Sequence, residues 1–285
     1  MRRLTQIRAL SLALIVSAAL APPARCQSPP KPDTVIVPSG PLTLRGILWR
    51  PAGDGPFPAI MFNHGGYATE GGETLGSEPA ILGPVFAKHG YVLLFLCRRG
   101  VGLSADQGPA EGDLMSRALT DSGQDGRNRV QLQLLETEAL NEATAGLEFL
   151  RALPAVDARR IGLAGHSFGG SLTLFVAARD TTVRAAVLFA GAAYSWERSP
   201  ALRNSLLAVV DHSTAPVLFL HAANDYSTTS GKALAAEMQR LGRPHRLKIY
   251  PAVGTTPREG HNFVFGSVAT WEPDVFAFLG EYLRR

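Results

Sequence analysis

The sequence predicts an α/β protein in which helices cover both faces of a mostly parallel sheet. After a pair of strands at 34–37 and 42–49, short apolar runs alternate with helix-like segments, which is the order that builds such a sheet. Residues 91–97 (YVLLFLC) are continuously apolar, as expected of a parallel strand buried on both faces. A chain of 285 residues, 46% of them hydrophobic, can bury a sizeable core without metals or disulfides.

The individual strands and helices are assigned from apolar runs, periodicity and turn residues. The turn at 38–41 (PSGP) separates the first two strands, and the run at 58–63 (PAIMFN) leads into a Gly-rich loop. Further strands are expected at 160–164, 185–189, 216–221 and 246–250. Helices are expected at 80–89, 130–152, 168–178, 230–241 and 270–284.

Two segments are predicted to cover the carboxyl edge of the sheet. Residues 104–128 are polar and weakly periodic, which indicates a long surface excursion with a short helix near 114–119. Residues 192–203 are the second candidate cover, because the stretch from Phe189 to Pro216 is too short for a large cap domain. There is no internal repeat and no shift in composition, so one domain over 34–285 is expected.

The N-terminus has the pattern of a secretory signal peptide over residues 1–21. Three arginines precede an uncharged apolar run at 9–20, which is shorter than the roughly 20 residues that a membrane-spanning helix needs. Small residues leave the cleavage site open between 19 and 26, and a Pro-rich linker at 22–33 follows. The alternatives are an uncleaved anchor and, through Cys26, a lipoprotein, although Arg25 disfavours the latter. We expect export to the periplasm or the extracellular space, without stable membrane insertion after signal removal.

Charge and motif content exclude several classes of function. Removing residues 1–21 takes away three arginines and no acidic residue, so the formal net charge of +4 becomes +1. The remaining basic residues are scattered, which does not indicate a nucleic-acid partner. The chain has two cysteines, no phosphate- or dinucleotide-binding glycine motif, and histidines at 64, 166, 212 and 221 without metal-ligand spacing. No metal and no cofactor are therefore expected.

The strongest chemical signal is the sequence GHSFGG at 165–170. It follows the strand-like run at 161–164 directly and precedes an apolar helical run, the context of a sharp strand-to-helix turn that carries a nucleophile. Such a turn places Ser167 at the carboxyl edge of the sheet and at a helix N-terminus, where developing negative charge is favoured. The alternative is a Gly-rich turn with an incidental serine.

A serine nucleophile needs a base, and His261 is the best candidate. With this turn the chain order is serine, acid, histidine, and among the histidines after the late strands only His245 and His261 qualify. His245 begins a strand and fits a solvated position there. His261 lies in the loop 254–262, after the last strand and before the last helix, where it can reach the sheet edge.

The acid that orients the histidine is expected at Asp225. It follows the apolar strand at 216–220 and therefore lies on the same edge as the serine. Asp211 precedes that strand and would emerge at the opposite edge. Three more acidic residues lie in loop or helix settings that do not converge on the site, namely Asp180, Glu197 and Glu237.

Backbone amides for an oxyanion are expected from two places. The loop NHGGY at 63–67 follows the strand at 58–62, so amides near Gly66 or Tyr67 can join the amide of Phe168 beside the serine. A plain hairpin or loop turn is the alternative for this segment. His64 is expected to support the loop by hydrogen bonds rather than to act in catalysis.

These motifs together resemble the α/β-hydrolase superfamily. The matching segments are HGG at 64–66, GHSFGG at 165–170, HAAND at 221–225 and GH at 260–261. The resemblance spans about 42–285 and is closest to dienelactone hydrolase-like and oligopeptidase-related serine hydrolases, particularly over 146–170. It implies the α/β-hydrolase fold without a large cap domain.

Three features depart from that resemblance. True dienelactone hydrolases use cysteine at the turn where this chain has Ser167, which argues against that particular activity. Oligopeptidases carry a large N-terminal propeller, for which the segment before the expected domain is too short. Cys97 stands where these hydrolases often have an aspartate, next to a loop at 99–104 that resembles theirs. We expect Cys97 to be an inert buried side chain.

The predicted function is that of an exported serine hydrolase acting on a carboxylic ester or related acyl bond of a small molecule. Tyr67, Tyr194, Trp196 and Tyr226 are candidates to line the substrate pocket, although each fits a surface loop equally well. The same machinery would suit an exopeptidase or a thioesterase, and no acidic cluster for a free amino terminus is evident. A non-catalytic binding protein of the same fold is the alternative from another class. The sequence does not indicate an oligomeric state.

Overall fold

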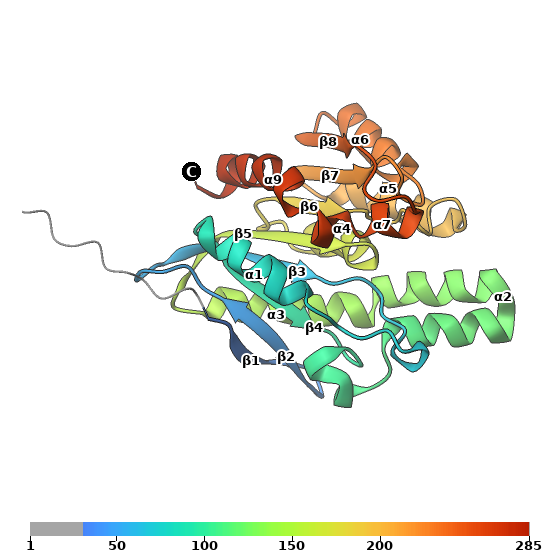
Figure 1. Ribbon diagram of the computed structural model, residues 1–285, viewed down its shortest axis with the longest axis horizontal. Coiled ribbons are helices and arrows are strands. Elements are labelled where there is room, and N and C mark those ends of the chain that lie inside the picture. The colour runs from blue at the N-terminus through green and yellow to red at the C-terminus, as the bar shows by residue number, and fades with distance from the viewer. Residues whose placement is uncertain (1–30, 285) are drawn as a thin grey trace, which may run out of the picture.

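The sheet has eight strands and is mostly parallel, as expected. The computed structural model describes residues 31–284 (Figure 1). The strand order is β1-β2-β4-β3-β5-β6-β7-β8, in which β1 and β2 are antiparallel and the strands from β4 to β8 run parallel. The strand bounds are β1 Asp33–Ser39, β2 Leu42–Trp49, β3 Phe57–Asn63, β4 Val92–Cys97, β5 Val156–His166, β6 Ala186–Phe189, β7 Val217–Ala222 and β8 His245–Tyr250.

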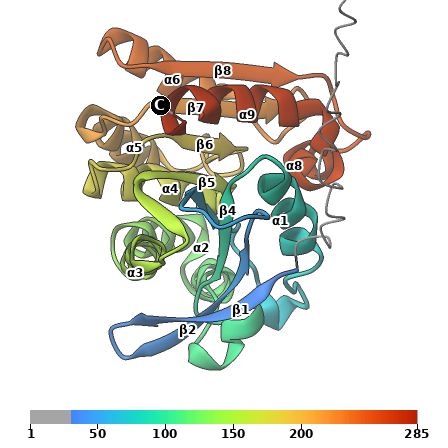
Figure 2. The same cartoon turned by 90° about the vertical axis from the view of Figure 1, so that its left-hand side faces the viewer.

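Helices cover both faces of this sheet, which confirms the predicted fold class. One hydrophobic cluster joins the sheet to α2 through α6, and the other joins it to α1, α8 and α9. Figure 2 shows α3, α4 and α5 on one side of the strands and α1 and α8 on the other. The bounds are α1 Glu78–Lys88, α2 Glu111–Glu136, α3 Glu138–Ala152, α4 Phe168–Arg179, α5 Pro200–His212, α6 Thr229–Arg240, α7 Pro257–His261, α8 Phe263–Gly266 and α9 Val268–Leu283, with 3₁₀ turns at Thr69–Gly71 and Gly102–Gln107.

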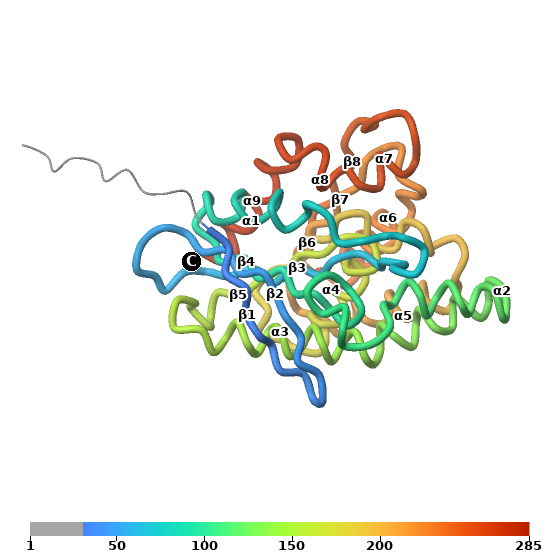
Figure 3. Tube along the Cα trace, turned by 60° about the horizontal axis from the view of Figure 1, so that its bottom comes forward, coloured from blue at the N-terminus to red at the C-terminus, as the bar shows by residue number. Residues whose placement is uncertain are grey.

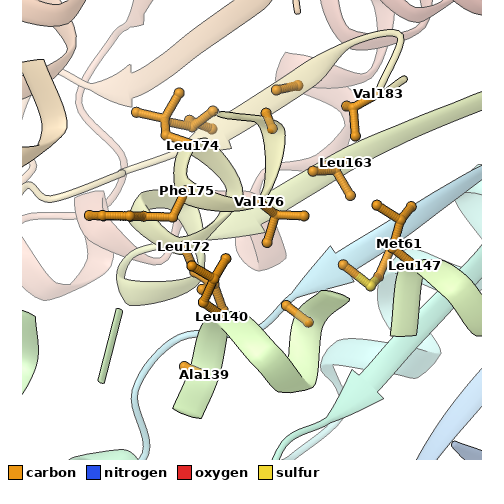
Figure 4. Packing of buried hydrophobic residues seen from close by; sticks show 14 of the residues in the cluster. Met61, Ala139, Leu140, Leu147, Leu163, Leu172, Leu174, Phe175, Val176 and Val183 are labelled. Atoms are coloured by element: carbon orange, nitrogen blue, oxygen red, sulfur yellow. The ribbon is translucent and has the colours of Figure 1, made fainter. Parts of the chain in front are cut away.

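The continuous apolar character of the central strands follows from this double cover. In β4, Leu94 and Leu96 belong to the cluster under α2 to α6, whereas Leu93 and Phe95 belong to the cluster under α1 and α9. Successive side chains of a strand point to opposite faces, so both sets must be apolar when both faces are buried. Figure 4 shows the first cluster, where Leu172 and the other labelled side chains of α4 pack against α3 and β5.

The largest departure from the sequence prediction lies in residues 104–128. Instead of a surface excursion with one short helix, the chain forms α2, which reverses at Gly123 (φ 66°, ψ −164°). A Cβ on Gly126 would lie 2.8 Å from the carbonyl oxygen of Ala118, whereas eight residues of continuous helix span about 12 Å. Residues 111–136 are therefore a helical hairpin, and it projects from the body at the end opposite the C-terminus (Figures 1 and 3).

Two further helix predictions need correction. The single helix expected at 130–152 is broken at Thr137 (φ −127°, ψ −95°), which separates α2 from α3. The segment 192–203 contributes Ala192, Tyr194 and Ser195 to the pocket lining, but no helix was predicted after it, and α5 begins within it at Pro200. Ser199 caps this helix by accepting a hydrogen bond from the Leu202 amide at 3.3 Å.

The carboxyl ends of β3, β4, β5 and β7 meet at one edge of the sheet, because these strands run parallel. The segments that carry the predicted site residues leave from this edge. Within residues 31–284, no helix combines the length and hydropathy needed to cross a membrane. The predicted signal peptide over 1–21, its cleavage site and nearly all of the linker lie outside the described residues.

Candidate active site

Ser167 lies on a sharp turn between β5 and α4. The strand ends at His166, the helix begins at Phe168, and Ser167 itself has φ 56° and ψ −116°. A non-glycine residue in this region of φ costs about 1–3 kcal/mol and is typical of functional turns. The Ser167 amide donates to the Phe189 carbonyl of the neighbouring strand at 2.9 Å, which holds the strained turn in place.

Glycines flank the turn because strand and helix approach too closely for side chains. A Cβ on Gly165 would lie 2.2 Å from the carbonyl oxygen of Gly169. A Cβ on Gly169 would lie 2.0 Å from the carbonyl oxygen of Asn63, at the end of β3. The glycines therefore hold the serine turn against the end of β3, where the Gly-rich loop begins.

The structure brings Ser167, His261 and Asp225 into one hydrogen-bonded chain. His261 Nε2 lies 2.8 Å from Ser167 Oγ, and His261 Nδ1 lies 2.7 Å from Asp225 Oδ1. His261 was expected in a loop, but it is the last residue of the short helix α7. A capping box between Thr256 and Glu259 begins this helix and sets the direction from which the imidazole approaches.

The Asp225 carboxylate is almost completely buried and is bound on both oxygens. His221 Nδ1 lies 2.9 Å from Oδ2, and the Tyr226 amide donates to Oδ1 at 2.7 Å. Burial alone would raise the pKa of Asp225, but the hydrogen bonds from His221 and His261 hold it below its ordinary value. His221 was not predicted as part of the site, although it belongs to the same HAAND motif.

His166 supports the base from behind the serine. Its Nε2 donates to the carbonyl oxygen of His261 at 3.0 Å, and its side chain is buried. Burial, reinforced by the nearby His261, lowers the pKa of His166 to about 3. The imidazole is therefore neutral at physiological pH and fixes the backbone of His261 without adding charge.

The loop predicted to supply an oxyanion amide lies beside Ser167 and Phe168. A Cβ on Gly65 would lie 3.7 Å from Ser167 Cβ, and one on Gly66 would lie 3.7 Å from Phe168 Cβ. Gly66, Tyr67 and Phe168 line the same pocket as the serine hydroxyl. His64 is buried behind this loop and does not line the pocket, in keeping with the supporting position predicted for it.

The pocket in front of Ser167 has a volume of about 840 Å³. Tyr194 and Tyr226 line it, with ring centroids 5.3 Å apart, and the Tyr226 ring lies 5.0 Å from the His261 ring. Tyr67 also lines it and donates its hydroxyl to Glu78 Oε1 at 3.0 Å. The prediction for Trp196 is wrong, because this side chain is only 4% exposed and packs in the hydrophobic core.

A model of the dienelactone hydrolase family matches residues 84–264, which is more than half of the chain. The chain belongs to the dienelactone hydrolase family. This confirms the resemblance found in the sequence. The curated polyketide transferase grgF from Penicillium sp is 28% identical over 234 residues, which cover 77% of this chain and 68% of the transferase.

Solved structures show the same fold. The dienelactone hydrolase of Anabaena variabilis superposes with a TM-score of 0.62 at 19% identity, over 90% of this chain and 100% of that one. The acylaminoacyl peptidase of Pyrococcus horikoshii superposes with a TM-score of 0.64 at 20% identity. That match covers 90% of this chain but 42% of the peptidase, so this chain spans less than half of the peptidase's length.

Several residues that line the pocket of this dienelactone hydrolase family member were not found from the sequence. Met115, Arg127 and Gln131 come from the helical hairpin, and Glu73 and Glu78 come from the segment before and at the start of α1. The hairpin therefore forms one wall of the pocket. Its pocket residues escaped prediction because the segment has no strong apolar period.

No metal centre is found among residues 31–284, where no group of three or more histidine, cysteine, aspartate or glutamate side chains is placed to hold an ion. Cys97 is fully buried at the end of β4, and burial raises the pKa of its thiol. A buried thiol with a raised pKa is a poor nucleophile, which agrees with the inert role predicted for it. Cys26 lies outside the described residues.

Proposed function

We propose that this protein is a serine hydrolase that cleaves a carboxylic ester of a small molecule through an acyl-enzyme intermediate. The observation that carries the proposal is the hydrogen-bonded chain Ser167–His261–Asp225 at the edge of a pocket. Membership of the dienelactone hydrolase family supports hydrolysis as the class of reaction. Ser167 in place of a cysteine points away from dienelactone hydrolysis itself.

Each residue of the chain has a separate role in the proposed mechanism. Ser167 Oγ attacks the ester carbonyl carbon while His261 Nε2 takes its proton, and Asp225 orients the imidazole and stabilises the imidazolium. The carbonyl oxygen becomes an oxyanion that accepts hydrogen bonds from the Phe168 amide and an amide near Gly66 or Tyr67. The tetrahedral intermediate collapses, His261 gives the proton to the leaving alcohol, and water then hydrolyses the acyl-enzyme by the same steps. No cofactor takes part in these steps.

The test is covalent labelling of Ser167 with a fluorophosphonate probe, together with turnover of a p-nitrophenyl ester. Ser167→Ala should abolish labelling and lower kcat by about 10⁴-fold or more. Ser171→Ala is the matched control, because this buried serine lies one helical turn further along α4. Labelling and turnover that persist in Ser167→Ala would sink the assignment. A folded wild-type protein that neither labels nor turns over would favour the non-catalytic binding protein.

One observation favours an exopeptidase as the second candidate. Glu73 and Glu78 both line the pocket, and Glu78 Oε2 is buried without a hydrogen-bond partner among the described residues. A carboxylate pair could bind the free amino group of a peptide substrate. The other oxygen of Glu78 and one of Glu73 accept hydrogen bonds from Tyr67 and the Ala68 amide, respectively, so both side chains already support the oxyanion loop.

A substrate panel separates these candidates. The ester proposal expects kcat/KM for p-nitrophenyl esters to exceed that for aminoacyl p-nitroanilides and for acyl thioesters. The exopeptidase candidate expects anilides with a free amino group to be cleaved faster than the same anilides with an acetylated one. A preference for the free amine that disappears in Glu78→Gln would replace the ester proposal with the exopeptidase.

We also propose that the protein is exported, on the basis of the N-terminal pattern in residues 1–21. N-terminal sequencing of the protein from the producing cells is the test. Export predicts a mature chain that begins after a residue between 19 and 26, recovered outside the cytoplasm. An intact Met1 in a membrane or cytoplasmic fraction would contradict cleavage. Lipid attachment that is lost in Cys26→Ser would identify a lipoprotein instead.

A further inference from the structure

A buried arginine lies directly behind the loop that carries the predicted oxyanion amides. Arg98 follows β4 and is fully buried, and its Nη2 donates to the carbonyl oxygens of His64 and Gly65 at 2.9 and 3.2 Å. Its Nε donates to the buried carboxylate of Glu111, the first residue of the helical hairpin. The guanidinium also lies 5.4 Å from the centre of the Phe168 ring. Arg98 therefore contacts both segments that would bind the oxyanion.

The Gly65 carbonyl receives a second hydrogen bond. The backbone amide of Arg98 donates to His64 Nε2 at 3.1 Å, so that nitrogen carries no proton and the neutral ring is protonated on Nδ1. Nδ1 then donates to Gly65 O at 2.6 Å. Burial and the adjacent Arg98 hold the pKa of His64 well below its ordinary value, so the imidazole stays neutral. Two donors thus fix one peptide group.

Fixing that carbonyl also fixes an amide. The peptide bond between Gly65 and Gly66 is trans, so the Gly66 N–H points away from the Gly65 carbonyl. With the carbonyl bound to Arg98 and His64 in the interior, the Gly66 N–H is directed toward the opposite side, where Gly66 lines the pocket. The hairpin holds the next part of this loop as well, because the Gly112 amide donates to the Tyr67 carbonyl at 3.1 Å.

Stability alone does not account for this ion pair. Arg98 Nη1 and Glu111 Oε2 are buried without a hydrogen-bond partner among the described residues. A buried pair with unsatisfied atoms contributes little to folding and is often replaceable by apolar side chains without loss. What the pair does provide is a rigid connection between β4, the hairpin and the Gly-rich loop.

We propose that Arg98, held by Glu111, is a positioning residue that aims the Gly66 amide at the oxyanion. The proposal rests on the proposed function and deepens it, because it selects Gly66 as a donor and assigns the supporting group. Arg98 does not touch the substrate. Its loss should weaken binding of the transition state while leaving binding of the ground-state ester nearly unchanged.

The test compares two double variants that each remove one arginine–glutamate pair at the end of β4. Arg98→Met/Glu111→Leu removes the positioning pair, and Arg99→Met/Glu142→Leu removes the neighbouring pair, which does not contact the Gly-rich loop. Removing both partners avoids leaving a buried charge unpaired. Thermal denaturation checks that both variants fold.

For a p-nitrophenyl ester, the first variant should lose about 10- to 100-fold in kcat with KM changed by less than about 3-fold. An alkyl trifluoromethyl ketone is the second probe, because Ser167 adds to its carbonyl and creates a stable oxyanion. Its affinity should fall by the same factor as kcat. The control variant should keep both quantities within about 3-fold of the wild type. A merely structural role would not move kcat and ketone affinity together while sparing KM.

A conservative variant keeps the proposal testable if the first double variant does not fold. Arg98→Lys retains the positive charge beside Glu111 but cannot hold both carbonyls with one planar fork, so kcat and ketone affinity should still fall. Wild-type values of both in either folded variant overturn the proposal. Failure of the proposed function would look different, because Ser167→Ala would then retain activity.

Discussion

Two histidines bind the two carboxylate oxygens of Asp225. His221 Nδ1 donates to Oδ2 at 2.9 Å, and His261 Nδ1 binds the other oxygen, Oδ1. Both imidazoles therefore hold one carboxylate, and only one of them reaches Ser167. The His221 side chain is nearly fully buried at the end of β7. The arrangement keeps Asp225 ionised in the interior and fixes the plane of its carboxylate, which in turn fixes the direction of His261.

Replacing His221 should lower stability near neutral pH and make Asp225 easier to protonate. In His221→Ala, Asp225 Oδ2 loses a hydrogen bond to a buried charged group, which should cost about 1.5–3 kcal/mol of folding free energy. The folded-state pKa of Asp225 is held below its unfolded value, so its stabilising contribution is present at higher pH and is lost as the pH falls through the folded-state pKa. Without His221 that pKa rises toward the unfolded value, so the contribution near neutral pH becomes smaller and its loss is complete at a higher pH.

Chemical denaturation between pH 3 and pH 8, together with kcat/KM over the same range, measures both effects. In His221→Ala the acid limb of kcat/KM should move to higher pH, whereas the acid-dependent loss of folding free energy should be smaller and end at a higher pH. His245→Ala is the matched control, because this histidine begins the adjacent strand and its side chain binds the local carbonyl of Arg243. Equal shifts in the two variants would show that His221 does not set the charge state of Asp225.

His166 should also make the folding stability sensitive to acid. Its pKa is lowered from 6.5 to about 3 by burial, so below pH 6.5 the unfolded chain binds a proton that the folded chain does not. Stability should therefore fall between pH 6.5 and about 3, by up to about 1.4 kcal/mol per pH unit. His166→Gln can keep the donor to the His261 carbonyl without titrating, so this slope should decrease. An unchanged slope would mean that His166 does not remain neutral in the fold.

Replacing Gly169, in the turn around Ser167, should destabilise the fold. In Gly169→Ala the new Cβ would meet the Asn63 carbonyl oxygen at 2.0 Å, so the start of α4 must move away from β3. We expect a loss of about 3 kcal/mol or more, by analogy with other overpacked buried sites. Gly280→Ala is the control, because nothing lies within 4 Å of its Cβ in α9. That substitution should stabilise the helix by up to about 1 kcal/mol, and thermal denaturation compares the two.

The sequence could predict the sheet and the three converging residues because both depend on local patterns. Ser167 follows β5 directly and Asp225 lies three residues after the end of β7, and parallel strands end at one edge. His261 follows the last strand after a short segment, so it must also lie near the same edge of the sheet. The order of the motifs along the chain was therefore enough to bring these residues together.

The helical hairpin could not be predicted in this way, because polar contacts between distant segments stabilise it. Asp113 accepts from the Thr69 hydroxyl at 2.6 Å, and Asn128 donates to the Arg198 carbonyl at 2.6 Å. Apolar periodicity detects helices that bury an apolar stripe, and many of the residues that this hairpin buries are polar. The break at Thr137 was missed because the apolar period continues across it.

Tyr194 and Trp196 are two residues apart but should affect different properties. Tyr194 is 36% exposed, lines the pocket and packs edge-on against Tyr226, whereas Trp196 is buried in the core. Tyr194→Ala should raise KM for aryl and acyl esters by about 3- to 10-fold, as expected for loss of one aromatic contact, while kcat changes less. Trp196→Phe should leave KM unchanged and lower the free energy of unfolding by about 1–3 kcal/mol.

Steady-state kinetics and thermal denaturation of both variants are the measurements. Tyr194→Phe, which keeps the ring, should resemble the wild type. An effect of Trp196→Phe on KM without loss of stability would place that side chain in the pocket after all.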